Sequence, residues 1–217
     1  MIKVCIFDLD GTLTDTLESL VFSVGATLKE MGLSEISKEE CRAFVGNGAR
    51  RLLEDALEAA GDIGYTRIEE AVEIYKRIFD EHCTYCVTPY EGVMSLLMEL
   101  KSKGIKIAVL SNKPHKQTVK VVREIIGDAW IDWAQGQQDS IKRKPDPEGI
   151  YKILERFGAD KEECMYIGDS EVDILTGHHA EVMTVGVTWG FRSKAQLKQA
   201  GAVNMIDKPD GLLELLQ

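Results

Sequence analysis

Short apolar runs alternate with longer helical stretches from Pro89 onward, and one further apolar run, residues 2–7, opens the chain. This alternation restricts the fold more than any other feature of the sequence. Each apolar run is rich in β-branched residues and too short for a helix, which is typical of a buried strand. The predicted strands are residues 2–7, 105–110, 130–134, 165–167 and 182–187, and the predicted helices lie at 93–104, 115–126, from 146 onward and 172–180. Strands that alternate with helices in this way predict a parallel sheet covered by helices on both faces.

Residues 15–87 interrupt this series after its first strand and are of a different kind. Three stretches within this block place apolar residues on one face of a helix, and the Gly46-Asn47-Gly48 turn opens the second of them. The block contains no convincing strand. The sequence therefore predicts an α/β fold: a Rossmann-like parallel-sheet core formed by residues 1–14 and 88–217, with an α-helical cap domain, residues 15–87, inserted after the first strand.

The charge and hydropathy of the chain narrow the classes of partner. With a formal net charge of −10, the surface repels polyanions, so we expect no nucleic-acid partner. The longest apolar runs are far below the roughly 20 residues that span a bilayer, and the N-terminus lacks the basic flank and cleavage site of a signal peptide. We therefore expect no membrane partner, a cytoplasmic location, and a monomer or homodimer.

The cysteines and the paired histidines receive no functional role from the sequence. Five cysteines are an odd number, which suits free thiols in a reducing compartment. Cys83 and Cys86 have the C-x-x-C spacing, but a second ligand pair at zinc spacing is missing, so we predict thiols at a helix end. The adjacent His178 and His179 are predicted to be surface residues of a helix.

Polar residues that follow the predicted strands indicate where a site would lie. In open parallel sheets, ligands bind outside the carboxyl ends of the strands. Asp8 and Asp10 come directly after the first strand, and Ser111 follows the second. Asp169 follows a later strand, and Lys144 lies in a loop before a helix. Four separated segments thus deliver carboxylates, a hydroxyl and an ammonium to the same edge of the sheet.

These residue types in one place are typical of a phosphoryl-transfer site. The carboxylates of Asp8 and Asp10 repel each other unless a cation lies between them or one holds a proton, and Asp169 would add a third negative charge. Mg²⁺ prefers oxygen ligands and commonly binds one or two carboxylates, waters and a substrate phosphate. The Lys144 ammonium and the Ser111 hydroxyl can hold phosphate oxygens. We therefore expect Mg²⁺ as cofactor and a small phosphorylated metabolite as partner.

Four segments resemble, in order, the motifs of the haloacid dehalogenase (HAD) superfamily of phosphotransferases. They are Asp8-Leu9-Asp10-Gly11-Thr12, Val109-Leu110-Ser111-Asn112-Lys113-Pro114, Lys144-Pro145-Asp146-Pro147 and Gly168-Asp169-Ser170-Glu171-Val172-Asp173. The resemblance covers essentially the whole chain, and the order and spacing of the motifs agree with it. It implies a HAD-like core and a helical cap that closes over the site.

The resemblance implies a covalent mechanism. Asp8 would be the nucleophile that forms an aspartyl-phosphate intermediate. Asp10 would protonate the leaving group and then activate water. Dehalogenases that attack carbon lack an aspartate two residues after the nucleophile, so the presence of Asp10 favours a phosphatase over a dehalogenase.

The resemblance also implies a metal site and a set of phosphate contacts. Mg²⁺ would be held by the carboxylates of Asp8 and Asp169 and by the backbone carbonyl of Asp10. Asp173 would support metal-bound waters or orient Lys144. The residues that would hold the phosphoryl group are Ser111, Lys144, Thr12 and Asn112.

The loop Phe44-Val45-Gly46-Asn47-Gly48-Ala49-Arg50 resembles the cap loop of bacterial phosphoglycolate phosphatases. Its glycines could bring the loop close to a small ligand, with Asn47, Gly48 and Arg50 as substrate-binding residues and a carboxylate met by Arg50 or the Asn47 amide. The alternative is a plain helix N-terminus with Asn47 or Gly48 at the cap. The resemblance of this loop makes 2-phosphoglycolate the first candidate substrate.

Other functions stay open at the level of sequence. A β-phosphoglucomutase-like sugar phosphomutase shares both aspartates and a similar cap, although the glycine-rich loop speaks mildly against it. A pyrophosphatase is a variant of the same chemistry. A phosphate-binding regulatory module without turnover is disfavoured because the nucleophile, acid, lysine and metal carboxylates are all present.

Overall fold

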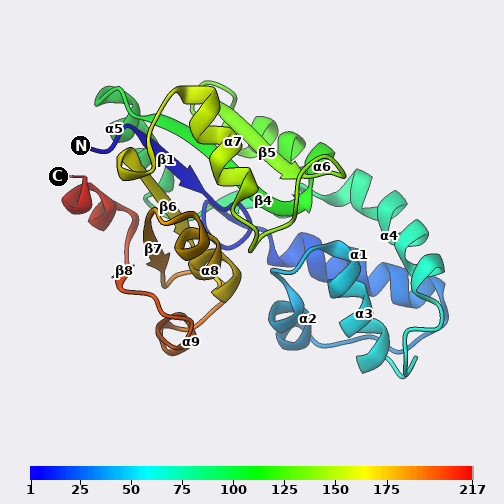
Figure 1. Cartoon of the computed structure of the whole chain (residues 1–217). Helices are drawn as coiled ribbons and strands as arrows, with labels where there is room; N and C mark the ends of the chain where they lie inside the picture. Colours follow the sequence, from blue (N-terminus) through cyan, green and yellow to red (C-terminus); the bar gives the residue numbers. More distant parts are fainter. Residues whose placement is uncertain (217) are drawn as a thin grey trace.

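The computed structural model describes residues 1–216 and contains a six-stranded parallel sheet (Figure 1). The strands lie in the order β5-β4-β1-β6-β7-β8, so the N-terminal strand lies inside the sheet. Their bounds are β1 Val4–Phe7, β4 Lys106–Pro114, β5 Trp133–Gln137, β6 Cys164–Gly168, β7 Met183–Val187 and β8 Asn204–Ile206. Phe7 pairs with Val109 on one side and with Ile167 on the other, so the segments that follow these residues emerge at one edge.

Helices cover both faces of this sheet. α5 (Val93–Ser102), α6 (His115–Val121) and the π-helical turn Val122–Ile126 share one apolar cluster with Phe7. α7 (Glu148–Phe157) and α8 (Glu171–Ala180) contribute to a second cluster with Ile6. Because successive side chains of a strand point to opposite faces, a strand buried on both sides must be apolar throughout, as β1 is.

Four helices between β1 and β4 form a group at the carboxyl ends of the strands, at the right of Figure 1. We call α1–α4 the helical group; their bounds are α1 Leu17–Glu30, α2 Lys38–Phe44, α3 Ala49–Ala59 and α4 Ile68–His82. Leu28, Leu53 and Phe79 are among its most deeply buried side chains. At the start of α2, Ser37 and Glu40 each accept a hydrogen bond from the other's backbone N–H, a capping box that fixes where this helix begins.

A two-stranded antiparallel ribbon joins the helical group to the sheet. Its strands are β2 (Thr14–Asp15) and β3 (Thr88–Pro89). The predicted cap, residues 15–87, begins at the second residue of β2 and ends just before β3. The chain ends with α9 (Lys194–Gln199), β8 and a 3₁₀ segment, Pro209–Leu215; a shorter 3₁₀ turn, Lys161–Glu163, precedes β6. Within residues 1–216, no helix is both long and apolar enough to cross a membrane.

The predicted α/β fold with a parallel sheet is confirmed. The strand predicted at 130–134 lies three residues later, because residues 127–130 form a turn closed by a hydrogen bond from the Trp130 N–H to the Gly127 carbonyl (3.1 Å). Helices α2 and α9 and strands β2, β3 and β8 were not predicted. Each is too short for hydrophobic periodicity to distinguish it from a loop.

Candidate active site

The carboxyl edge of the sheet brings the residues predicted from the motifs around one pocket. Those that line it are Asp8, Asp10, Ser111, Asn112, Lys144 and Asp169. The opposite wall comes from the helical group. The cavity measures about 50 Å³, far below the roughly 300–1,000 Å³ of pockets for drug-sized ligands. It therefore suits a ligand of few heavy atoms.

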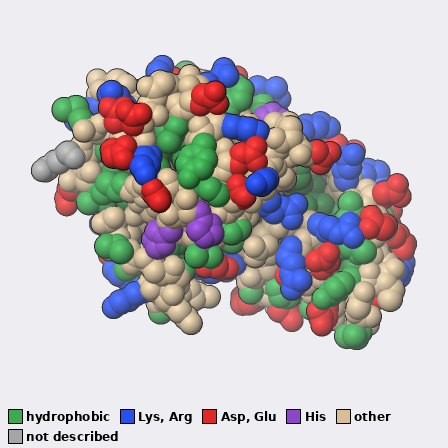
Figure 2. Space-filling view, viewed as in Figure 1, with side chains coloured by type: hydrophobic (Ala, Val, Ile, Leu, Met, Phe, Trp, Pro, Cys, Tyr) green, Lys and Arg blue, Asp and Glu red, His purple; other side chains and the backbone are tan. Residues whose placement is uncertain are grey.

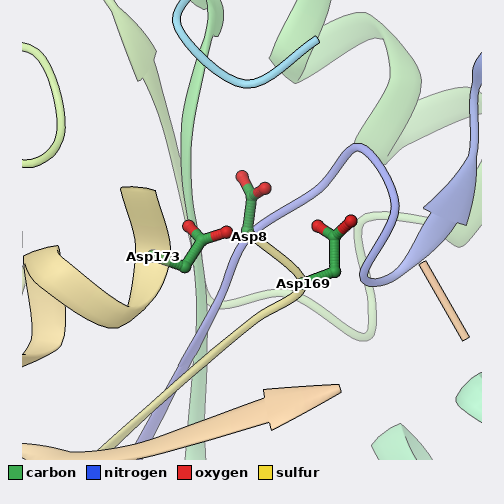
Figure 3. A group of neighbouring side chains, drawn as sticks. All are labelled: Asp8, Asp169 and Asp173. Atoms are coloured by element: carbon green, nitrogen blue, oxygen red, sulfur yellow. The ribbon is translucent and has the colours of Figure 1, made fainter. Parts of the chain in front are cut away.

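Three buried carboxylates lie at the centre of the site (Figure 3). One oxygen each from Asp8, Asp169 and Asp173 lies within 4.8 Å of the other two. Asp8 follows β1, Asp169 follows β6 and Asp173 belongs to α8; the first two point to the same side, and Asp173 points toward Asp8. Carboxylates this close oppose one another's ionisation unless a cation joins them.

Two glycines allow the loops around this cluster to approach closely. Gly11 has a φ of +90°, and a Cβ atom there would overlap the carboxylate of Asp169. A Cβ atom at Gly190 would overlap both the Gly11 carbonyl and the Asp169 side chain. Any other residue at either position would push Asp169 away from the first loop.

Asp8 is buried without a complete set of hydrogen bonds. The Lys144 Nζ lies 2.9 Å from Asp8 Oδ1 as an ion pair, but it is not aligned as a hydrogen bond, and Oδ1 has no hydrogen-bond partner among residues 1–216. Burial raises the pKa of Asp8 to about 7; Lys144 opposes the rise, and Asp173 and Asp10 add to it. Such an oxygen costs about 1–3 kcal/mol, so a cation or ligand there would stabilise the site.

Asp169 has two partners. Its Oδ2 accepts a hydrogen bond from the Phe191 N–H (2.7 Å), and its Oδ1 accepts one from the Thr12 hydroxyl (3.2 Å). Burial, together with the charges of Asp173 and Asp8, raises the pKa of Asp169 well above its usual range. Thr12, predicted to contact substrate, instead donates to Asp169 and does not line the pocket.

Asp173 holds Lys144 in place. Its Oδ1 accepts hydrogen bonds from the Lys144 ammonium (2.7 Å) and the Tyr166 hydroxyl (2.8 Å), and its Oδ2 accepts from the Ser170 hydroxyl and N–H. Burial acts to raise the pKa of Asp173, but Lys144 and these hydrogen bonds lower it overall. Burial acts to lower the pKa of Lys144, and Asp173 and Asp8 raise it well above the usual value. Lys144 is therefore a fixed cation beside Asp8.

Asp10 lines the pocket and pairs with Lys113, which the sequence analysis did not single out. The Lys113 Nζ lies 2.9 Å from Asp10 Oδ1 and 4.7 Å from the centre of the Phe79 ring. The Asp10 carboxylate thus faces Lys113 and is not one of the three central carboxylates. The sequence does contain a signal that places Lys113 near the site: Lys113 follows Ser111 by two residues, and a strand places such residues on one face.

The side chain of Asn112 connects three segments. Its Nδ2 donates to the carbonyls of Gly46 (3.0 Å) and Lys144 (3.1 Å), and its Oδ1 accepts from the Lys144 N–H (3.0 Å). Both donors and the acceptor are therefore engaged by the protein. This placement does not support the predicted phosphate contact by Asn112, which instead holds the Lys144 loop and the helical group together.

Two of the three predicted cap residues do not reach the pocket. Arg50 is exposed on the solvent side of α3, where its charge is paired with Glu69 (2.8 Å), so its placement does not support a contact with substrate. Asn47 is also exposed, and its carbonyl accepts a hydrogen bond from Arg143 (3.1 Å). Gly48 lines the pocket, but it is also the N-cap residue of α3. The loop thus forms a helix N-terminus, as in the alternative interpretation, and Gly48 is the one predicted cap residue that reaches the pocket.

Two arginines fasten α2 to the segment after β7; we call them the arginine clasp. Arg42 donates to the carbonyls of Gly190 (2.7 Å) and Phe191 (3.0 Å). Arg192 donates in return to carbonyls at the C-terminal end of α2, with the shortest bond to Val45 (2.6 Å). The last carbonyls of a helix lack helical partners, which makes them good acceptors. Figure 2 shows Lys and Arg side chains along the boundary between the helical group and the rest of the protein.

The wall from the helical group is mainly apolar. Leu20, Leu52, Tyr75 and Phe79 line it, and the rings of Tyr75 and Phe79 stack with their centres 4.9 Å apart. Burial raises the pKa of Tyr75 well above its usual value, so this phenol stays neutral. The helical group therefore limits the size of the pocket and contributes no charged side chain to this wall.

The cysteines and paired histidines lie outside the pocket. Cys83 is the buried C-cap residue of α4 and Cys86 is exposed, which confirms the prediction of thiols at a helix end. His178 and His179 are exposed on α8, as predicted.

Comparison with known proteins decides the family. A family model described as haloacid dehalogenase-like hydrolase matches residues 5–187. The chain belongs to the haloacid dehalogenase-like hydrolases. This membership agrees with the resemblance seen in the four motifs.

Relatives of this haloacid dehalogenase-like hydrolase are phosphatases. Phosphoglycolate phosphatase from Aquifex aeolicus is 33% identical over 189 residues, which covers 87% of this chain and 86% of that protein. Pyrophosphatase PpaX from Bacillus mycoides is 32% identical over 216 residues, with 99% and 97% covered. A crystal structure from Haemophilus somnus, described as a predicted phosphoglycolate phosphatase, has a TM-score of 0.92 at 27% identity and covers all of this chain and 98% of its own. The chain is a phosphatase of the HAD superfamily.

Proposed function

We propose that this enzyme is a Mg²⁺-dependent phosphatase that hydrolyses a small phosphomonoester through an aspartyl-phosphate intermediate on Asp8. The observation that carries the proposal is the buried Asp8 carboxylate, which lies beside Lys144 and has one oxygen without a hydrogen-bond partner in residues 1–216. A nucleophilic oxygen must be available in this way, and a nearby cation can hold the phosphoryl oxygens during transfer.

The reaction has two steps. An Asp8 oxygen bonds to phosphorus while the ester bond breaks, and the leaving oxygen receives a proton from Asp10. Water then attacks phosphorus, Asp10 takes its proton, and the Asp8–phosphate bond breaks to release inorganic phosphate. Ser111 and Lys144 hold the phosphoryl oxygens in both steps.

The donors around Asp8 fit Mg²⁺. The carboxylates of Asp8 and Asp169 are close together, and both have raised pKa values because they are buried near other carboxylates. Asp173 is less suited as a direct ligand because it is ion-paired with the Lys144 ammonium and accepts two hydrogen bonds at each oxygen, whereas each oxygen of Asp169 accepts only one. Asp8, Asp169 and the backbone carbonyl of Asp10 would hold the ion, which when bound would neutralise charge on the transferring phosphoryl group.

The first candidate substrate is 2-phosphoglycolate. The cavity of about 50 Å³ suits a two-carbon ester, and relatives such as the Haemophilus influenzae protein, 30% identical over 97% of this chain, are named phosphoglycolate phosphatases. Pyrophosphate is the second candidate because of the similarity to Pyrophosphatase PpaX.

A phosphate-release panel tests the proposal. Purified enzyme with Mg²⁺ is given 2-phosphoglycolate, pyrophosphate and β-glucose 1-phosphate, and kcat/KM is measured for each. We expect the highest value for 2-phosphoglycolate and loss of release when EDTA removes the metal. Isomerisation of β-glucose 1-phosphate without net phosphate release would overturn the assignment in favour of the mutase.

A further inference from the structure

Lys113 has an ammonium group inside the pocket whose hydrogen-bonding capacity is mostly unused. Its side chain is only 2% exposed, and it enters the pocket from β4. Among residues 1–216, its one hydrogen-bond partner is Asp10 Oδ1, at 2.9 Å. An ammonium carries three N–H donors, and a buried charge is costly unless those donors are satisfied. Two donors of Lys113 are therefore available to a ligand.

The other two cations that line the pocket are already engaged. The Lys144 ammonium lies within 3.1 Å of three oxygens, from Asp8, Asp173 and Tyr166. The Arg192 guanidinium donates to Glu171 and to the carbonyls at the end of α2. A second anionic group on the substrate would have to displace these bonds, whereas at Lys113 it would fill open donors.

The position of Lys113 relates it to the leaving group. It pairs with Asp10, the residue proposed to donate a proton to the leaving oxygen, so a charge close to that oxygen would lie near the Lys113 ammonium. The Phe79 ring on the other side, 4.7 Å from Nζ, favours a cation and excludes water. Ionic interactions are strengthened in such an apolar setting.

We infer that Lys113 determines specificity for leaving groups that carry an anionic group beside the ester oxygen. The inference rests on the proposed phosphatase function and narrows its substrate class. A carboxylate, as in 2-phosphoglycolate, and a phosphoryl group, as in pyrophosphate, share the required chemistry. A phosphate ester of the same size whose leaving group is uncharged lacks this chemistry.

A comparison of two esters tests Lys113. Ethyl phosphate has the same ester linkage as 2-phosphoglycolate, with a methyl group in place of the carboxylate. We expect Lys113→Met to lower the ratio of kcat/KM for 2-phosphoglycolate over ethyl phosphate by about 10- to 100-fold, the usual range for a lost charged hydrogen bond. Lys113→Arg, which keeps the charge, retains most of the ratio. A parallel loss for pyrophosphate would extend the same recognition to a phosphoryl group.

Lys116→Met is the matched control. Lys116 is exposed on α6 and pairs with Asp80 (2.7 Å), so its loss should leave the ratio unchanged. If Lys113→Met lowered kcat/KM equally for both esters, Lys113 would only support Asp10, and the inference would be overturned. It would also be overturned if the preference for the acidic ester survived in Lys113→Met. A wild-type enzyme that hydrolyses both esters without preference contradicts the substrate class itself, whereas a wild-type enzyme without phosphatase activity contradicts the proposed function.

Discussion

The two walls of the pocket differ in what holds them together. The wall from the sheet is charged, and its groups are held by ion pairs such as Lys144–Asp173 and Lys113–Asp10. The wall from the helical group is mainly apolar and packs through stacked rings and aliphatic side chains. Burying charge costs stability, whereas burying apolar surface provides it. This difference agrees with the proposal that the sheet wall carries the chemistry, while the helical wall limits the size of the ligand.

The charged wall should therefore be optimised for activity and not for stability. Asp8→Asn removes the proposed nucleophile, and we expect kcat to fall by at least about 1,000-fold. Because burial raises the pKa of Asp8 to about 7, the ionised form is disfavoured in the folded state at neutral pH. The variant should then melt at the same temperature as wild type or higher without Mg²⁺, as followed by circular dichroism.

Asp55→Asn serves as the control for this substitution, since Asp55 lies on α3 and pairs with Arg51 away from the pocket. Because Asp55 does not line the pocket, its kcat should stay close to that of wild type. Near-wild-type turnover in Asp8→Asn would contradict the proposed chemistry of the sheet wall.

The arginine clasp joins the two walls, so breaking it should affect the charged wall from a distance. Arg192→Ala removes the hydrogen bonds to the end of α2 and loosens the segment whose Phe191 N–H holds Asp169. We expect the affinity for Mg²⁺ to fall by about 10- to 100-fold, which is the usual loss when a residue that supports a metal ligand is removed. Titration of activity and of thermal stability with Mg²⁺ measures the change.

Arg67→Ala is the matched control for the clasp. Arg67 also donates to a backbone carbonyl, that of Met31 (3.0 Å), but within the helical group. Its removal should leave the affinity for Mg²⁺ unchanged. An equal change in both variants would mean that general stability of the helical group, and not the clasp, affects the metal site.

The charged wall also predicts how Mg²⁺ binding depends on pH. The folded pKa of Asp8, about 7, lies above its ordinary value of 3.8, so the cost of ionising it is absent below about pH 4 and fully present above about pH 7. Without metal, the contribution of Asp8 to the free energy of unfolding therefore falls as pH rises through this window. Mg²⁺ offsets the cost, so it should raise Tm by several degrees more at pH 8 than at pH 5. Equal shifts at both pH values would contradict the prediction.

Substitutions in the helical wall should change which sizes of substrate are accepted, and they should have the smallest effect on turnover. Leu52→Val removes one methylene from the pocket lining and should cost about 0.5–1.5 kcal/mol of stability. We expect kcat for p-nitrophenyl phosphate to change by less than about threefold and relative activity on bulkier esters to rise. A large fall in kcat on every substrate would show that this wall also contributes to the chemistry.

The two walls also differ in how well the sequence predicts them. Asp8, Asp10 and Asp169 follow strands whose carboxyl ends meet at one edge, so local patterns are enough to bring them together. The bonds from Arg42 to Gly190 and from Lys113 to Asp10 join residues more than 100 positions apart, and no local pattern encodes them. The prediction that Arg50 contacts substrate required its side chain to lie on the pocket side of α3, whereas it lies on the solvent side.

Trapping the covalent intermediate is the most direct test of the central claim, that Asp8 is the nucleophile. Asp10→Asn lacks the proposed base that activates water, and p-nitrophenyl phosphate has a leaving group that needs no acid, so the intermediate should accumulate. Rapid acid quench followed by peptide mass spectrometry should locate one added phosphoryl group on Asp8, and the double variant with Asp8→Asn should show none. A phosphoryl group on another residue, or release of p-nitrophenol with no adduct at any time, would contradict the account.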